Sequence, residues 1–115
     1  MRACSEFSSI YLYRDAIDFR KSINGLVALV EGELSRSAFE PALYLFCNKQ
    51  RDKLKILYWD NTGFALWYKR LERDRFKWPK ALAEQSLMLT AVEVHRLLAG
   101  YDVIGHRQLH YSSHY

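Results

Sequence analysis

The sequence predicts an α+β domain in which a small antiparallel β-meander of three to five strands packs against one long N-terminal helix, with a short C-terminal helix. Three observations lead to this fold class. Apolar residues recur at helical spacing over residues 18–34, three β-rich runs with short polar connections occupy residues 42–72, and a helix-capping pattern begins at Thr90. No internal repeat or low-complexity linker divides the chain, so we expect one domain.

The first strand and the long helix are predicted within residues 10–34. The run IYLYR at 10–14 is short and rich in β-forming residues. In DFRKSINGLVALVEGEL the apolar residues fall at offsets of 0, 4, 7, 8, 11 and 15 from Phe19, which is one stripe of an α-helix. Asp18 is the expected N-cap, because its carboxylate can accept a free amide and oppose the helix dipole. Gly25 lowers helix propensity by about 1 kcal/mol, so we expect it to permit close backbone packing.

The meander is predicted from the runs ALYLFCN, KLKILYWD and FALWYKRLE, which are joined by the turns KQRD and NTG. Side chains alternate between the two faces of a strand, and an antiparallel sheet can leave one face in water. One face of the second run is apolar, while the other carries two lysines with Leu57 and Trp59. We therefore expect one face to pack against the helix and the other to expose cations beside indole rings.

The pattern is weaker after the meander. The run RFKW at 75–78 could extend the sheet until Pro79 removes an amide donor. The run SLMLT at 86–90 is either a further short strand or the lead-in to a helix. Thr90 with Glu93 forms a capping-box pattern, and the apolar spacing that follows predicts a helix ending at the next glycine.

Length and composition indicate one soluble domain of 115 residues, half of them hydrophobic. We expect a variable segment at 1–9, the domain at 10–103 and a disordered tail at 104–115. No apolar run approaches the roughly 18 residues of a membrane span, and a secretory leader is lacking, so we expect a cytoplasmic protein without membrane contact. Cys4 and Cys47 are too few for a disulfide scaffold or a four-cysteine zinc site, and we expect free thiols.

Positive charge is concentrated in the aromatic segment. Residues 49–80 hold ten Lys or Arg and four acids, whereas the rest of the chain holds seven bases and nine acids. The formal net charge of +4 therefore understates a local excess that falls on the meander and the stretch after it.

No set of catalytic groups, cofactor motif or phosphate-cradling glycine spacing is present, so the sequence predicts no enzymatic activity and no cofactor. Asp15, Asp18 and Asp60 could gather into a metal-binding carboxylate site that cuts nucleic acid. The first two, however, precede a helix, where negative charge is favoured, and Asp60 sits where a turn favours Asp.

Three C-terminal histidines recur every four residues, so a helix there would align them like metal ligands. A glycine precedes them and two serines interrupt them, which favours a polar tail instead. We expect no metal site at His106, His110 and His114.

Cations interleaved with large rings are typical of nucleic-acid binding, because phosphates attract Lys and Arg while bases stack on aromatic rings. The alternative is that the rings form the core and the cations merely solvate the outer face. No pattern specifies a base sequence or a groove. The candidate DNA-binding residues are Arg51, Lys53, Lys55, Trp67, Lys69, Arg70, Arg73, Arg75, Lys77 and Trp78.

The order of the motifs resembles the Orf2-like (TnpB) accessory proteins encoded by transposable elements of the insertion sequence 66 family. The resemblance runs over about residues 10–103 and depends on DFRKSINGL, on RDKLKILYWDNTGFALWYKRLERDRFKWP and on LT followed by LLAGYD. Residues 47–49 depart from the usual turn entry of the family, and both termini look idiosyncratic.

The resemblance implies a bacterial accessory role in DNA transposition, beside a separately encoded transposase that supplies the catalytic acids. It implies element-end DNA and that transposase as partners, and leaves the oligomeric state open. Three hypotheses follow: a DNA-binding accessory factor, a protein–protein adaptor that docks on the transposase without touching DNA, and a metal-dependent nuclease using the three acids.

Overall fold

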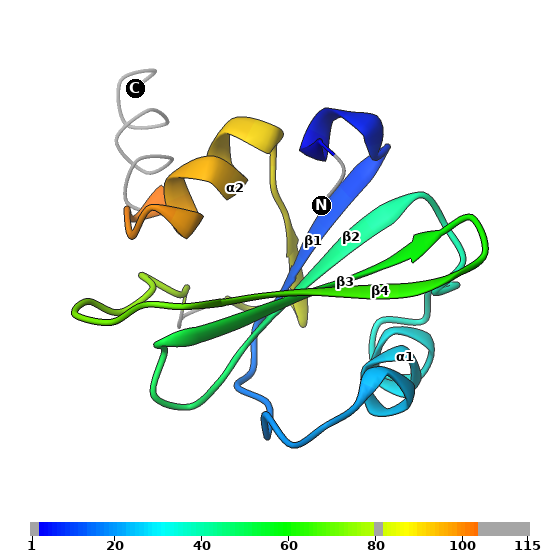
Figure 1. The fold of residues 1–115 in the computed structure, drawn as a ribbon, viewed down its shortest axis with the longest axis horizontal. Coiled ribbons are helices and arrows are strands. Elements are labelled where there is room, and N and C mark those ends of the chain that lie inside the picture. Colours follow the sequence, from blue (N-terminus) through cyan, green and yellow to red (C-terminus); the bar gives the residue numbers. More distant parts are fainter. Residues whose placement is uncertain (1–2, 80–81, 104–115) are drawn as a thin grey trace.

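The computed structural model describes residues 3–79 and 82–103 as a mixed five-stranded sheet with a helix on each side (Figure 1). A 3₁₀ turn at Cys4–Glu6 precedes β1. The strands are β1 (Ser9–Tyr13), β2 (Ala42–Cys47), β3 (Lys53–Asp60), β4 (Gly63–Arg70) and β5 (Ser86–Met88), and the helices are α1 (Ile23–Gly32) and α2 (Ala91–Leu98). The α+β class and the strand count are confirmed.

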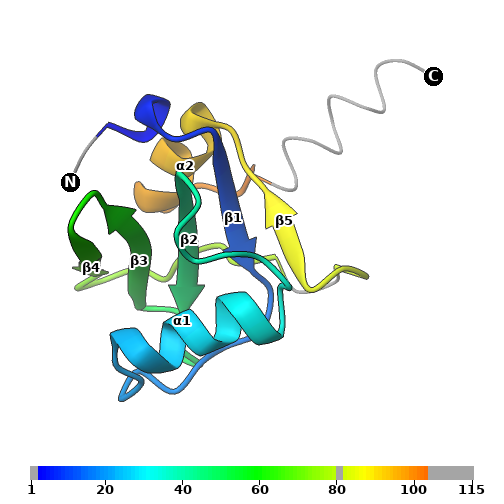
Figure 2. The ribbon, with the colours of Figure 1, turned by 90° about the vertical axis from the view of Figure 1, so that its right-hand side faces the viewer.

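The sheet is not a purely antiparallel meander. Its strand order is β4-β3-β2-β1-β5, which Figure 2 shows side by side. The β2–β3–β4 meander is confirmed as antiparallel, and β5 pairs antiparallel with β1. β1 and β2, however, run parallel, because the chain crosses over through α1 before it re-enters the sheet. The run SLMLT thus contributes a strand, whereas residues 75–78 do not extend the sheet.

Helix α1 is shorter than expected. It begins after Ser22, which makes no side-chain cap, and it ends at Gly32. The Asp18 carboxylate instead accepts hydrogen bonds from the amide and guanidinium of Arg20 in a turn that precedes the helix, so the predicted N-cap is wrong. A Cβ at Gly25 would meet only the Lys21 side chain, at 3.4 Å, so this glycine serves no close approach of two backbones.

Helix α2 confirms the capping box. The Thr90 hydroxyl accepts from the Glu93 amide at 3.1 Å, and the Glu93 carboxylate accepts from the Thr90 amide at 2.9 Å. Gly100 follows the helix with φ of +94°, the left-handed conformation expected of a glycine at a helix end.

Apolar residues cover both faces of the sheet, so the expected solvated face is absent. α1 packs on the face that carries Tyr44, Phe46 and Leu57. α2 and the 3₁₀ turn pack on the other face, with Leu45 and Ile56. The prediction of a single core face was wrong because β3 is buried at both parities from Leu54 to Tyr58, with Lys55 and Leu57 on the face that α1 covers.

Both cysteines are buried free thiols in the face covered by α2. Burial raises the pKa of Cys47 to about 11, and the nearby Arg51 guanidinium opposes that shift. Within residues 3–79 and 82–103, no helix has the length and apolar character needed to cross a bilayer. The histidines at 106, 110 and 114 and the predicted tail lie outside the described residues.

Candidate nucleic-acid interface

The β2–β3 turn is built around the buried Asn48 side chain. Its Oδ1 accepts from the amides of Asp52 and Lys53 at 3.2 and 3.0 Å, and its Nδ2 donates to the Asp52 carboxylate at 2.6 Å. This hydrogen bond lowers the pKa of Asp52. Arg51 completes the turn with a left-handed φ of 62°. A network of this kind fixes the backbone, so the turn holds its flanking lysines in defined positions.

The chain after β4 runs alongside this turn. The Leu71 amide donates to the Asp52 carbonyl at 2.8 Å, and the Phe76 amide donates to the Arg51 carbonyl at 2.7 Å. Arg75 adds a side-chain bond from Nη1 to the Gln50 carbonyl at 2.9 Å. Two segments that are about 20 residues apart in sequence are thereby joined at one end of the sheet.

The rings of residues 76–78 anchor the segment while the cations between them face outward. Phe76 and Trp78 are buried in the core cluster under α2. The Trp78 Nε1 donates to the Tyr13 carbonyl at 3.0 Å, and only 4% of this residue is exposed. Arg75 and Lys77 alternate with these rings and are exposed. Alternation in the sequence therefore separates an inner row of rings from an outer row of charges.

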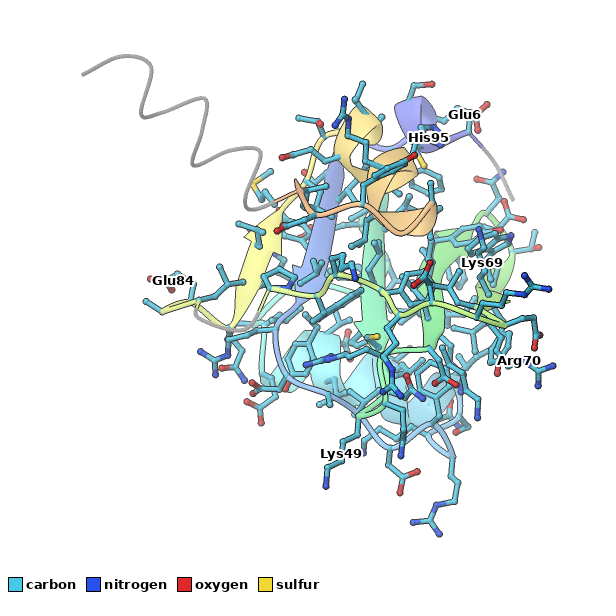
Figure 3. The ribbon with its side chains drawn as sticks, turned by 90° about the vertical axis from the view of Figure 1, so that its left-hand side faces the viewer. Glu6, Lys49, Lys69, Arg70, Glu84 and His95 are labelled. Atoms are coloured by element: carbon cyan, nitrogen blue, oxygen red, sulfur yellow. The ribbon has the colours of Figure 1, made fainter. Side chains whose placement is uncertain are left out.

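These elements form what we call the basic end, which consists of the outward-facing or half-buried cations of the two segments. In Figure 3, Lys49 projects at the bottom of the view and Arg70 at its right-hand side. Arg70 is paired with Glu72 at 2.9 Å, while Asp52 and Asp74 are the other carboxylates of these segments, so positive charge remains in excess. The basic end comprises Lys49, Lys53, Arg70, Arg73, Arg75 and Lys77.

Two predicted DNA-binding residues are in the interior and are removed from the candidate surface. Trp78 is one, as its buried and hydrogen-bonded ring cannot stack on a base. Lys55 is the other, with 9% of its surface exposed. Its Nζ donates to the carbonyls of Phe19 and Lys21 at 2.8 and 3.2 Å and lies 4.5 Å from the centre of the Phe19 ring. Burial lowers the pKa of Lys55, and the negative charge of Asp18 partly offsets this by raising it.

Three further candidates are half-buried and face inward. Trp67 packs against the core cluster under α2. The Lys69 Nζ donates to the Leu98 carbonyl at 2.9 Å, which complements the C-terminal end of α2. The Arg51 guanidinium lies 5.7 Å from the centre of the Trp78 ring. These residues position the site, and the basic end supplies its exposed charge.

The acids proposed as a nuclease site are not brought together. Asp15 pairs with Arg14 at 2.9 Å, and Asp18 pairs with Arg20 at 2.6 Å. In the part of the chain that the structure describes, no three His, Cys, Asp or Glu side chains form a group able to hold a metal ion.

The list of candidate DNA-binding residues left out some that lie beside the basic end. Arg20 and Lys21 lie in the loop before α1, which Lys55 ties to β3. Tyr68 is exposed on β4, two residues before Arg70. Arg20 and Lys21 are visible in the sequence as two adjacent cations. Their position beside the basic end, however, depends on the hydrogen bonds of the buried Lys55.

The fold and the basic end define a small α+β protein with one cationic end suited to a polyanion. The chain belongs to the family described as IS66 Orf2 like protein, whose model matches residues 8–108. It is 36% identical over 86 residues to the uncharacterized protein y4jC of Sinorhizobium fredii, which covers 75% of this chain and 73% of that protein. It is 29% identical over 85 residues to the uncharacterized protein y4hO of the same organism, and the match covers 74% of this chain and 73% of that protein. No solved structure matches the chain significantly.

Proposed function

We propose that this chain is a non-catalytic accessory factor for transposition of an insertion sequence 66 family element, and that its basic end binds the phosphates of the element's DNA. Family membership supports the transposition role. The observation that carries DNA binding is the joining of two basic segments by main-chain hydrogen bonds, which holds six cations on one end of the sheet. Cations on a fixed backbone lose less entropy on binding than cations on a flexible tail.

This binding depends on charge and not on base sequence. Since Trp78 and Lys55 are internal, the basic end presents guanidinium and ammonium groups that attract phosphate oxygens. Each phosphate contact on duplex DNA contributes about 0.9 to the slope of log affinity against log salt. The six cations therefore set an upper limit of about 5 on the steepness of that slope.

A double variant, Arg73→Gln with Lys77→Gln, tests the proposal by fluorescence anisotropy with a duplex of the element end. Both side chains are exposed, so the variant should fold normally. Arg75 is left intact because it holds the Gln50 carbonyl. We expect clearly weaker binding at low salt, and wild-type affinity for the matched control Arg96→Gln on α2. Absence of binding by the wild-type protein at low salt would refute the DNA-binding function.

An aromatic cluster with one exposed ring, at the opposite end of the β3–β4 hairpin, favours the adaptor as a second candidate function. Phe39, which is exposed, lies 4.9 Å from the Trp59 ring centre and 5.3 Å from that of Phe64. Exposed rings of this kind anchor protein interfaces. Pull-down with purified transposase, before and after nuclease treatment, separates the two functions. Capture that survives nuclease treatment and is lost in Phe39→Ala would support direct docking.

A further inference from the structure

Tyr68 is the exposed ring that lies beside the basic end. It is 48% exposed on β4, on the sheet face that α1 partly covers. The Phe19 ring supports it, with ring centres 5.9 Å apart and planes tilted by 57°. The other exposed rings in the described residues are Phe39, in the aromatic cluster at the far end of the hairpin, and Tyr101, after α2. Of these three rings, Tyr68 is the one on the strand that leads into the basic end and its cations.

Strand register brings these cations to the ring. Lys55 pairs with Tyr68 across β3 and β4, and Lys53 pairs with Arg70 one step further on the same face. The Lys55 Nζ holds the carbonyl of Lys21 at 3.2 Å, which brings the basic loop before α1 to the same place. Side chains on one face of paired strands at this spacing are neighbours.

The carboxylates Asp18, Asp52 and Glu72 lie near this place, and each has a partner. Asp52, whose charge acts on Arg70, accepts a hydrogen bond from the Asn48 Nδ2 at 2.6 Å. Asp18 lies 2.6 Å from the Arg20 guanidinium, and Glu72 lies 2.9 Å from the Nε of Arg70. Lys21 and Lys53 add positive charge. A half-exposed tyrosine surrounded by a net positive charge offers a ring face and phosphate partners together.

We propose that Tyr68 is a stacking platform for an unpaired nucleotide, so that the basic end binds single-stranded DNA as well as duplex. This inference rests on the proposed DNA-binding function. The base stacks on the open side of the Tyr68 ring, while its flanking phosphates contact Lys21, Lys53 and Arg70. In duplex DNA the base faces are already stacked on each other, so the ring contributes only to the binding of single strands.

The test compares Tyr68→Ala, Tyr68→Phe and the control Phe39→Ala for binding to a thymidine oligonucleotide and to a blunt duplex of equal length. Loss of one base stack weakens binding by roughly tenfold. We expect that loss for Tyr68→Ala on the single strand, wild-type affinity for Tyr68→Phe and Phe39→Ala, and duplex affinity within about twofold for all variants. Circular dichroism checks that each variant is folded.

The possible failures are distinguishable. If Tyr68→Ala binds the single strand as wild type does and duplex binding persists, the platform is refuted while the proposed function stands. An equal loss on both DNAs likewise refutes base stacking. If the wild-type protein binds neither DNA, both proposals fail together.

Discussion

Trp78 offers a sharp test of how the aromatic segment is used. Replacing it with Phe keeps most of the buried ring but leaves the Tyr13 carbonyl without its indole donor, which lies at 3.0 Å. An unsatisfied buried acceptor costs about 1–3 kcal/mol. For a domain of this size that loss lowers the melting temperature by roughly 4–12 °C. Trp78→Ala adds the cavity of a deleted core ring, about 3–5 kcal/mol, and should leave little folded protein.

Thermal unfolding followed by circular dichroism measures the stability of Trp78→Phe, and anisotropy with duplex DNA measures its affinity. We expect a lower melting temperature with affinity within about twofold of wild type at a temperature where the variant is folded. A variant with unchanged stability and strongly weakened DNA binding would show that the indole is a surface contact, which would overturn the assignment of Trp78 to the core.

Three further predictions concern the loop before α1 and the helix itself. Lys55→Met should lower the free energy of unfolding by about 1–3 kcal/mol in urea titrations, because two loop carbonyls lose their ammonium donor. Unchanged stability would show that the hydrogen bonds from Lys55 do not hold the loop on β3. Gly32→Ala should raise it by about 0.5–1 kcal/mol, since the helical position has open space around it. The pKa of Asp18 is lowered to about 2 by hydrogen bonds from the side chain and amide of Arg20. The stabilisation from this depressed pKa is present above about pH 4 and is lost as the pH falls through about 2. An NMR titration should show the pKa rising toward 3.8 in Arg20→Ala, and an unshifted midpoint would exclude the pairing.

Local pattern was enough to predict the meander and the second helix. Runs of β-forming residues separated by short polar turns defined β2, β3 and β4, and Thr90 with Glu93 marked the start of α2. These features depend on residues close in sequence. The parallel pairing of β1 with β2 could not be predicted in the same way, because strand order depends on how α1 crosses over the sheet.

The error at Asp18 has a specific physical cause. A carboxylate before an apolar stripe is a good N-cap, but here Arg20 is a closer partner, and the loop carbonyls are satisfied by Lys55 from β3. The stripe therefore begins in a loop whose Phe19 still packs against the sheet. Apolar periodicity identified the buried side of this segment and not the start of its helix.

The sequence predicted most of the exposed cations of the candidate surface, but it was wrong about which aromatic rings are exposed. The cations Arg70, Arg73, Arg75 and Lys77 are exposed, because burying a charged side chain is unfavourable. Trp78 and Lys55 lie inside because both faces of the sheet are covered, which no single strand reveals. Tyr68, one of the rings of the same segment, was not among the candidate DNA-binding residues, because its exposure could not be predicted from its strand alone.

An NMR titration of labelled protein with duplex DNA locates the binding surface residue by residue. The account predicts amide shifts concentrated in residues 49–53 and 70–77, which diminish as salt is raised. Shifts confined to α2 and β5, or to the aromatic cluster of Phe39, Trp59 and Phe64, would contradict it.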